Sequence, residues 1–261
     1  MAGGADAQLE GAFGVTFPGV FGMAARRHMY LYGATLDQIT AVSVKARRLA
    51  ARNERAQFRN EVSAAEILNS RTVADPLRLL HCCPLSDGCA ALVITRTVRA
   101  PRAKSRAVQI RGLAQVSDDF QTASDLTTFP ETTRAARIAC ESAGIGIDDI
   151  NLFEVHDCFA IAEIMHCEDL GLCEPGAGGR LVEEGATLPG GRFPVNPSGG
   201  MLGKGHPLGA SGVAQLVELT EQLRGQAGAR QVADARAGLA HCIGGFTLGK
   251  PASVAVTIVS V

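Results

Sequence analysis

The chain has 261 residues, of which 46% are hydrophobic and 20% are charged, so it is long and apolar enough to fold around a globular core. Its formal net charge of −1 and its aromatic fraction of 5%, with no Trp, give no reason to expect a nucleic-acid partner. No apolar run approaches the roughly 20 residues of a membrane span, and neither end resembles a secretion or peroxisomal signal, so a cytoplasmic localisation is predicted.

The first part of the chain predicts a helical region. Residues 15–53 contain two helical stretches joined at Gly33. Residues 63–70 predict a short helix with Ser63 as its N-cap and Glu66 in the capping-box position. Side chains of these two types can bond the free backbone N–H groups of a first helical turn.

Strand-like segments follow between residues 76 and 96, around a predicted turn at residues 86–88. The apolar strand predicted at residues 90–94 has no obvious partner nearby in the sequence, which would leave an exposed edge. The basic stretch 95–106, which contains one proline, is the best candidate for a domain boundary.

From residue 105 onward, predicted strands and helices alternate. The predicted strands are 107–116, 150–159, 192–200, 237–245 and 253–261, and the predicted helices are 132–144, a segment near 161–171 and 210–226. The helices show apolar residues at helical spacing, whereas the strands are short apolar runs. The order β-α-β-α-β-α-β-β predicts a complete α/β layered unit.

Three loops at the ends of predicted strands carry reactive side chains. His156 lies in the sequence HDCF, His206 lies in the glycine-rich sequence NPSGGMLGKGHPLGASG, and Cys242 lies in HCIGG. Open α/β sheets build their sites where the carboxyl ends of their strands meet. The three side chains are therefore expected to converge on one site.

Each of these loops also has a less specific interpretation. A histidine in a glycine-rich loop can be structural, Cys242 could be a buried inert thiol, and His156 could simply pair with Asp157. A phosphate-binding loop is disfavoured because no Ser or Thr follows Lys204. The eight cysteines contain no CxxC pair, so we expect free thiols and predict no metal site.

The glycine-rich sequence closely resembles the Gly-His-Pro loop of thiolases, and CIGG resembles their C-terminal Cys-x-Gly motif. HDCF resembles the segment that replaces Asn-Glu-Ala-Phe in thiolases of the sterol-carrier-protein type. Residues 16–33 and 75–93 also look like that subgroup, so the resemblance runs from about residue 14 to the end. It implies a thiolase-like layered α/β fold and Claisen chemistry on a coenzyme A thioester, through an acyl-cysteine intermediate.

The resemblance also implies roles for individual residues. His206 would activate the nucleophilic cysteine and hydrogen-bond the thioester oxygen, and Cys242 would exchange a proton with the substrate α-carbon. His156 would organise the first oxyanion hole, and the Gly244 N–H would serve the second. Substrate binding is expected from Ser198, Gly199, Gly245 and Phe159, with Ser198 and residues 15–75 along the coenzyme A channel. No metal and no bound cofactor is implied, since coenzyme A and its acyl thioester are substrates.

By the same resemblance, residues 1–75 correspond to a loop-domain-like helical region, 76–104 to the end of the N-terminal half and 105–261 to the C-terminal thiolase domain. No nucleophile is identified, because the flanks of Cys82, Cys83 and Cys89 do not resemble the nucleophile sequence of the family. The chain is therefore expected to act with a partner N-terminal thiolase subunit or as a homo-oligomer.

Two functions remain open at this point. The first is a thiolase-type acyltransferase, which carries out 3-ketoacyl-CoA thiolysis or Claisen condensation of acyl-CoA. The second is a non-thiolytic thiolase-like subunit, either a scaffold that binds coenzyme A thioesters or a retro-aldol lyase acting on sterol side chains. The presence of His156, His206 and Cys242 favours the first, whereas the missing nucleophile favours the second.

Overall fold

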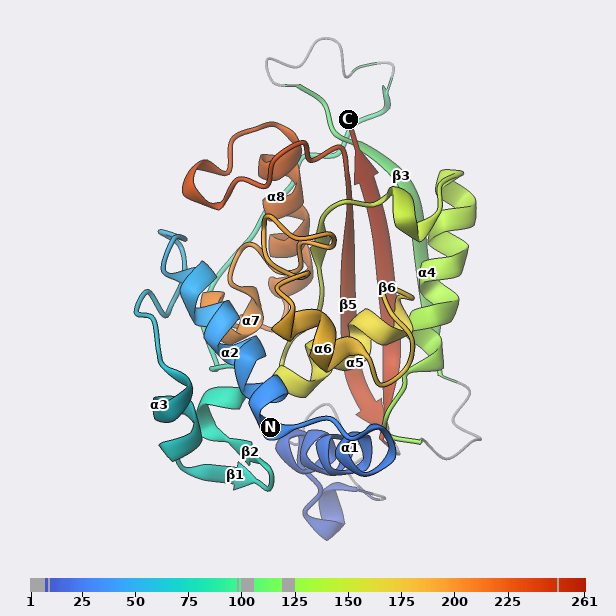
Figure 1. Cartoon of the computed structure of the whole chain (residues 1–261). Helices are drawn as coiled ribbons and strands as arrows, with labels where there is room; N and C mark the ends of the chain where they lie inside the picture. The colour runs from blue at the N-terminus through green and yellow to red at the C-terminus, as the bar shows by residue number, and fades with distance from the viewer. Residues whose placement is uncertain (1–7, 9, 98, 100–105, 119–124, 248) are drawn as a thin grey trace.

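The computed structural model describes residues 8, 10–97, 99, 106–118, 125–247 and 249–261. A four-stranded sheet in the order β3-β6-β5-β4 lies at its centre (Figure 1). The strands are β3 (Gln109–Ser117), β4 (Phe153–Glu154), β5 (Ala237–Thr247) and β6 (Lys250–Ser260). β6 is antiparallel to both of its neighbours, whereas β4 pairs in parallel with β5.

The helices that follow β3 in the chain are α4 (Pro130–Ala143), α5 (Ala160–Asp169), α6 (Gly178–Glu183), α7 (Gly200–Lys204) and α8 (Ser211–Leu223). α4 and α8 pack on opposite faces of the sheet, whereas α6 and α7 pack on a helix of the N-terminal region. α4 lies on the face that carries His241, where Thr132 Oγ1 is 3.0 Å from His241 Nε2. α8 packs on the opposite face, where Gly212 lies beside Cys242. Because neighbouring side chains on a strand point to opposite faces, His241 enters the core and Cys242 faces the α8 side.

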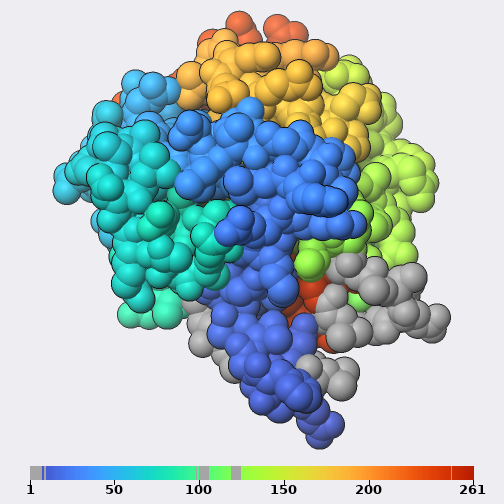
Figure 2. Space-filling model, turned by 60° about the horizontal axis from the view of Figure 1, so that its bottom comes forward, coloured from blue at the N-terminus to red at the C-terminus, as the bar shows by residue number. Residues whose placement is uncertain are grey.

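The N-terminal region packs against this core and covers much of the face seen in Figure 2. It contains α1 (Phe17–Tyr32), α2 (Leu36–Ala50), α3 (Ala64–Asn69), β1 (Thr72–Ala74) and β2 (Leu77–Arg78). Phe21 of α1 is 1% exposed and contacts the rings of Phe129, Phe159 and Phe246. This aromatic cluster joins α1 to the hydrophobic core of the C-terminal half.

α2 and α7 approach each other so closely that only glycine fits between them. A Cβ added to Gly203 would lie 2.5 Å from the Ala50 Cβ and 2.7 Å from the Ala46 carbonyl oxygen. A Cβ added to Gly199, whose φ is 95°, would also lie 2.5 Å from the Ala50 Cβ. Two glycines of the glycine-rich sequence are therefore required by the packing of α2.

The helices of the N-terminal region agree with the prediction. α1 ends at Gly33 with φ 73°, and α2 begins a few residues later. Ser63 and Glu66 form the predicted capping box of α3, with the Glu66 amide donating to the Ser63 hydroxyl.

The C-terminal half keeps the predicted order of its long strands and helices, but the strand predicted at residues 150–159 is a strand only at Phe153–Glu154, and the short helices α6 and α7 were not predicted. The largest departure in this half is at residues 192–200. This predicted strand forms only a single bridge, from Val195 to Phe153. The chain turns at Asn196, with φ 54°, and again at Gly199 and Gly200, which also have positive φ. Ladder pairing cannot continue through such left-handed positions, so the segment becomes a loop.

Residues 76–96 depart further from the prediction. Residues 90–94 form no regular secondary structure and pair with none of the described strands, and Val93 is 99% exposed. Isolated bridges from Cys82 to Phe159 and from Leu85 to His206 instead tie the preceding residues to the C-terminal half. The predicted boundary at residues 95–106 lies mostly outside the described residues. The division into three regions stays a prediction.

We predict that Gly203→Ala destabilises the protein, because its methyl group would press on Ala50 and on the backbone of α2. Overpacking of this kind should lower the free energy of unfolding by about 1–3 kcal/mol, measured by urea denaturation. Gly190→Ala is the matched control, since Gly190 has no positive φ and no atom within 4 Å of its added Cβ. Equal effects of the two substitutions would contradict the proposed contact.

Candidate active site

The structure brings His156, His206 and Cys242 together. His156 follows β4, His206 follows α7, and Cys242 lies on β5. Cys242 Sγ is 3.5 Å from His156 Nδ1, and the rings of His156 and His206 are perpendicular with their centroids 5.1 Å apart. A thiol and two imidazoles, the residue types of proton-transfer sites, thus occupy one small volume.

Two serines hold the imidazole and backbone of His206. Its backbone N–H donates to Ser86 Oγ at 3.1 Å, and its Nδ1 lies 2.8 Å from Ser211 Oγ. Because the Ser211 hydroxyl donates to the Pro207 carbonyl at 3.1 Å, its oxygen accepts a hydrogen from Nδ1. The hydrogen-bond network therefore assigns the Nδ1–H tautomer, which leaves Nε2 of His206 able to accept a proton.

Burial keeps these groups uncharged at neutral pH. It lowers the pKa of His206 to about 4, with the nearby Lys204 ammonium adding to the effect. Burial, together with His206 and His241, holds the pKa of His156 well below its usual value. Burial raises the pKa of the Cys242 thiol to about 11. The site thus offers neutral imidazoles that can accept protons and a thiol that can donate one.

The residues expected to bind substrate differ in how exposed they are. Ser198 is fully buried, with its hydroxyl donating to Glu154 at 2.8 Å, and Phe159 stacks on Phe21 in the core. Gly199 faces α2, and Gly245 is half-buried with φ 66°. Gly244 is exposed, two residues from Cys242 on the same strand, and no atom lies within 4 Å of its added Cβ. Among these positions, Gly244 therefore has the most room for a ligand beside the thiol.

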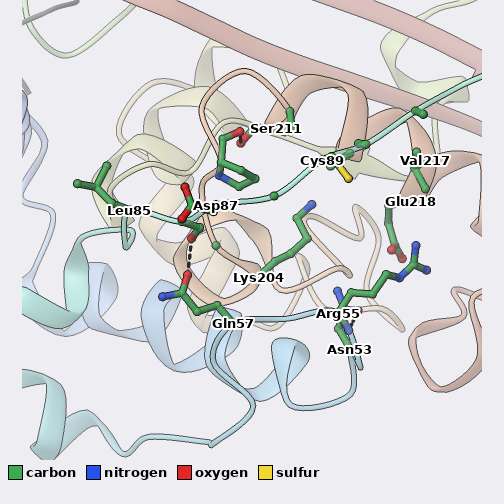
Figure 3. A pocket seen from close by; sticks show the side chains of 18 residues that line it. Asn53, Arg55, Gln57, Leu85, Asp87, Cys89, Lys204, Ser211, Val217 and Glu218 are labelled. Carbon is green, nitrogen blue, oxygen red and sulfur yellow. Dashed lines mark hydrogen bonds between the residues drawn. The ribbon is translucent and has the colours of Figure 1, made fainter.

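A cavity of about 720 Å³ lies on the other side of the His206 loop (Figure 3). It is bounded by residues 53–57, residues 85–91, the end of α7 and the first turns of α8. Ser211, which holds the His206 ring, lines its wall, and Lys204 extends into it. Lys204 pairs with Glu154 at 3.6 Å, and Arg55 pairs with Glu221. These two cations of the wall are therefore already compensated within the chain.

Sequence reasoning missed several residues of this site. Ser86 is 120 residues from His206 in the chain, and tertiary contacts such as the bridge between Leu85 and His206 bring the two segments together. Ser211 lies five residues after His206, within reach of its ring at the start of α8, so its spacing offered a signal.

Two negative observations hold within the described residues. No three His, Cys, Asp or Glu side chains are grouped so that they could hold a metal ion. The helices in that part of the chain are also too short or too polar to cross a lipid bilayer.

Comparisons with known proteins find similar chains by sequence and by structure. A sequence model described as "Thiolase C-terminal domain-like" matches residues 112–257. The chain is 47% identical to an acetyl-CoA acetyltransferase of Methanothermobacter thermautotrophicus over 94% of its length, and 42% identical to sterol carrier protein 2 of Bos taurus over 87%. It spans 64% of the former protein and 43% of the latter. A solved structure titled "Ltp2-ChsH2(DUF35) aldolase" matches 96% of the chain and 66% of its own length, with a TM-score of 0.84 and 28% identity.

We predict that Cys242 is alkylated slowly at neutral pH. Since only the thiolate reacts and the pKa is about 11, the iodoacetamide rate should rise close to tenfold per pH unit up to about pH 10. Peptide mapping by mass spectrometry measures this rate, with the exposed Cys89 as an internal control. A plateau of the Cys242 rate near about pH 8 would show that the thiol is not buried as described.

We also predict a stability that falls with acid. The pKa of His241 is lowered to about 3 by burial, so the unfolded chain binds protons more readily than the folded one. Its contribution is therefore constant above the unfolded value near pH 6.5 and turns destabilising as the pH falls from there toward 3. His241→Asn should reduce the slope of unfolding free energy between about pH 6 and pH 4 by up to about 1.4 kcal/mol per pH unit.

Thr132→Val is the matched control for this slope. It removes the hydroxyl that contacts His241 but leaves the titrating ring in place. It should lower stability without changing the slope, measured by denaturant unfolding at a series of pH values. An unchanged slope in His241→Asn would refute the assignment to His241.

Proposed function

The chain belongs to the thiolase family, and we propose that it is the proton-transfer part of a thiolase-type acyltransferase. Its substrate would be a 3-ketoacyl-CoA in the thiolytic direction, or two acyl-CoA molecules in the condensing direction. The observation that carries the proposal is the meeting of the Cys242 thiol with His156 and His206, beside the open space at Gly244.

In thiolysis, a cysteine thiolate attacks the β-keto carbon, the bond between the α- and β-carbons breaks, and the α-carbon takes up a proton. Cys242 would supply that proton from its neutral thiol, and its contact with His156 Nδ1 offers a partner for the thiolate that remains. Condensation is the reverse, in which the Cys242 thiolate removes the α-proton. A thiol suits this exchange because its pKa is closer than that of a carboxylate to the pKa of a thioester α-carbon.

His206 would act on the attacking thiol. Its Nε2 is free to take the thiol proton, because its Nδ1 hydrogen is bound to Ser211. The resulting Nε2–H can then donate to the thioester oxygen, and the Gly244 N–H can donate to the second developing oxyanion. Free coenzyme A would then accept the acyl group from the attacking cysteine in thiolysis, so the scheme requires coenzyme A and its acyl thioester as substrates.

The attacking thiol is proposed to come from a thiolase N-terminal half, as a partner subunit or a covalent extension, or from a second copy of the chain. Burial raises the pKa of both Cys82 and Cys83 to about 11 and about 12, which makes them poor nucleophiles. Exposed apolar side chains at Leu85, Val93 and Ile94 mark a surface close to the site where a partner could pack.

A retro-aldol lyase or a thioester-binding scaffold is the second candidate. It is supported by the similarity to the solved structure named as an aldolase, and by the lack of an identified nucleophile. A lyase would need a base for the β-hydroxyl group and an oxyanion site, which His206 and Gly244 could provide, but it would not need an acyl-accepting thiol.

Exchange of the α-hydrogens of acetyl-CoA in D2O tests the proposed role of Cys242 without requiring the nucleophile. The purified chain should catalyse deuterium uptake, detected by mass spectrometry, and Cys242→Ala should lose about 100-fold or more of it. Cys89→Ala is the control, because this exposed thiol lies outside the proposed mechanism. Exchange that survives in Cys242→Ala would exclude the proposed role.

The same protein separates the two candidate functions. Acetoacetyl-CoA thiolysis that appears on addition of a thiolase N-terminal half supports the acyltransferase. Cleavage of a 3-hydroxyacyl-CoA to a carbonyl product, with no thiolysis under any combination, supports the lyase.

A further inference from the structure

Three buried carboxylates lie beneath the segment that leads to His206. Glu154 is the last residue of β4, Asp157 is next to His156, and Glu163 is on α5; their exposed fractions are 1%, 0% and 0%. Buried charges are costly unless they are well bonded, so their placement together calls for an explanation. All three contact residues 195–204 or a lysine that does.

Glu163 and Glu154 each contact both a cation and this segment. Glu163 pairs with Lys45, whose Nζ also donates to the Val195 carbonyl at 3.2 Å. Glu154 accepts from the Ser198 hydroxyl at 2.8 Å and lies 3.6 Å from Lys204 Nζ. These two carboxylates are compensated in the ordinary way for buried charges.

Asp157 differs because its partners in the described part of the chain are backbone amides, and no ion pair to it is found there. Its Oδ1 accepts from the Met201 N–H at 2.6 Å, and its Oδ2 lies 3.5 Å from the Leu202 nitrogen. The carboxylate rests against Gly200 so tightly that a Cβ at that position would collide with it. Asp157 thus bonds to the amides of the first turn of α7, while burial and the nearby Glu163 raise the pKa of its carboxyl well above the usual value.

The position of this contact links the two histidines. Asp157 adjoins His156, while α7 ends at Lys204 and passes through Gly205, with φ 109°, directly into His206. The Asp157 side chain therefore joins the segment that carries His156 to the short helix that leads into His206. The N-cap residue Gly199 has no side chain that could bond the first amides of α7, and the neighbouring Ser198 hydroxyl accepts only from the Gly200 N–H, at 3.2 Å.

We propose that Asp157 is a positioning residue that sets the separation and angle of the His156 and His206 rings by holding α7. That this placement of the rings serves proton transfer rests on the proposed function. That Asp157 holds α7, and with it the His206 ring, can be tested without measuring turnover. Asp157 touches neither imidazole and is not assigned a step in proton transfer.

Asp169 provides a matched control. It is also a buried carboxylate beside a helix start, accepting from the N–H of Phe129, the N-cap residue of α4, at 2.9 Å and from the Thr128 hydroxyl at 2.6 Å. Neither of these partners belongs to α7 or to the His206 loop. If Asp157 acted only as a helix cap, the Asn variants of both residues would have effects confined to the adjoining helical turn.

The test compares Asp157→Asn with Asp169→Asn by NMR on the full chain. Asp157→Asn should speed amide exchange of Gly203 and Gly205, which bond to Gly199 and Met201, by about tenfold or more. It should also raise the imidazole pKa of His206 by about half a unit or more, because a looser loop admits water to the ring. Asp169→Asn should speed exchange at Thr132 and leave both readouts at the His206 loop unchanged.

The proposal is overturned if folded Asp157→Asn keeps both loop readouts at wild-type values, or if Asp169→Asn changes them equally. Should Asp157→Asn fail to fold, Asp157→Ser, which can still accept one amide hydrogen, is read by the same two measurements. A chain without α-hydrogen exchange activity that shows the expected NMR changes would refute the proposed function and support the positioning role. If the wild-type chain exchanges the α-hydrogens but Asp157→Asn leaves both NMR measurements of the loop unchanged, the proposed function is supported and the positioning role is refuted.

Discussion

The site depends on one constraint: a buried loop must find hydrogen-bond partners for its backbone without a sheet ladder to supply them. Residues 195–206 run between α2 and the residues after β4, and buried side chains provide those partners. Carboxylates below the loop accept its amides, Lys45 donates to a carbonyl, and Ser86 receives the N–H of His206. An unpaired buried amide is costly, so this set of bonds largely determines where the imidazole lies.

The same burial explains the chemistry of the site. Removal from water favours the neutral forms of His156, His206 and Cys242, and the neighbouring histidines and lysine disfavour further positive charge. In the free protein these thiol and imidazole groups are therefore uncharged. Charge would develop on them only when a proton is transferred to or from a bound substrate. Ser211 fixes the tautomer of His206, since its bond to Nδ1 leaves Nε2 as the nitrogen that can accept a proton.

The sequence predicted the regular elements better than the contacts. Helices such as α2 and α8 have strong local signals, and the alternating apolar run of β6 is explicit. The strand expected at residues 192–200 failed because Asn196 adopts a left-handed conformation that its apolar neighbours did not reveal. The prediction that the three reactive segments lie at strand ends holds only for His156, because Cys242 lies within β5 and the strand predicted before His206 is a loop. The three side chains nevertheless meet, whereas Ser86 and Asp157 act through partners that are distant in the chain or through the backbone.

The contact of Leu85 and Ser86 with the His206 loop has a consequence for how such chains can be recombined. A Cβ at Gly205 would lie 2.6 Å from Ser86 Oγ, while the Ser86 oxygen accepts the N–H of His206. Positions 86 and 205 therefore constrain each other sterically although they fall in different predicted regions. A chimera with a crossover between these positions takes residue 86 from one parent and residue 205 from the other. It should keep a well-ordered His206 loop only if these two residues fit against each other as Ser86 and Gly205 do here.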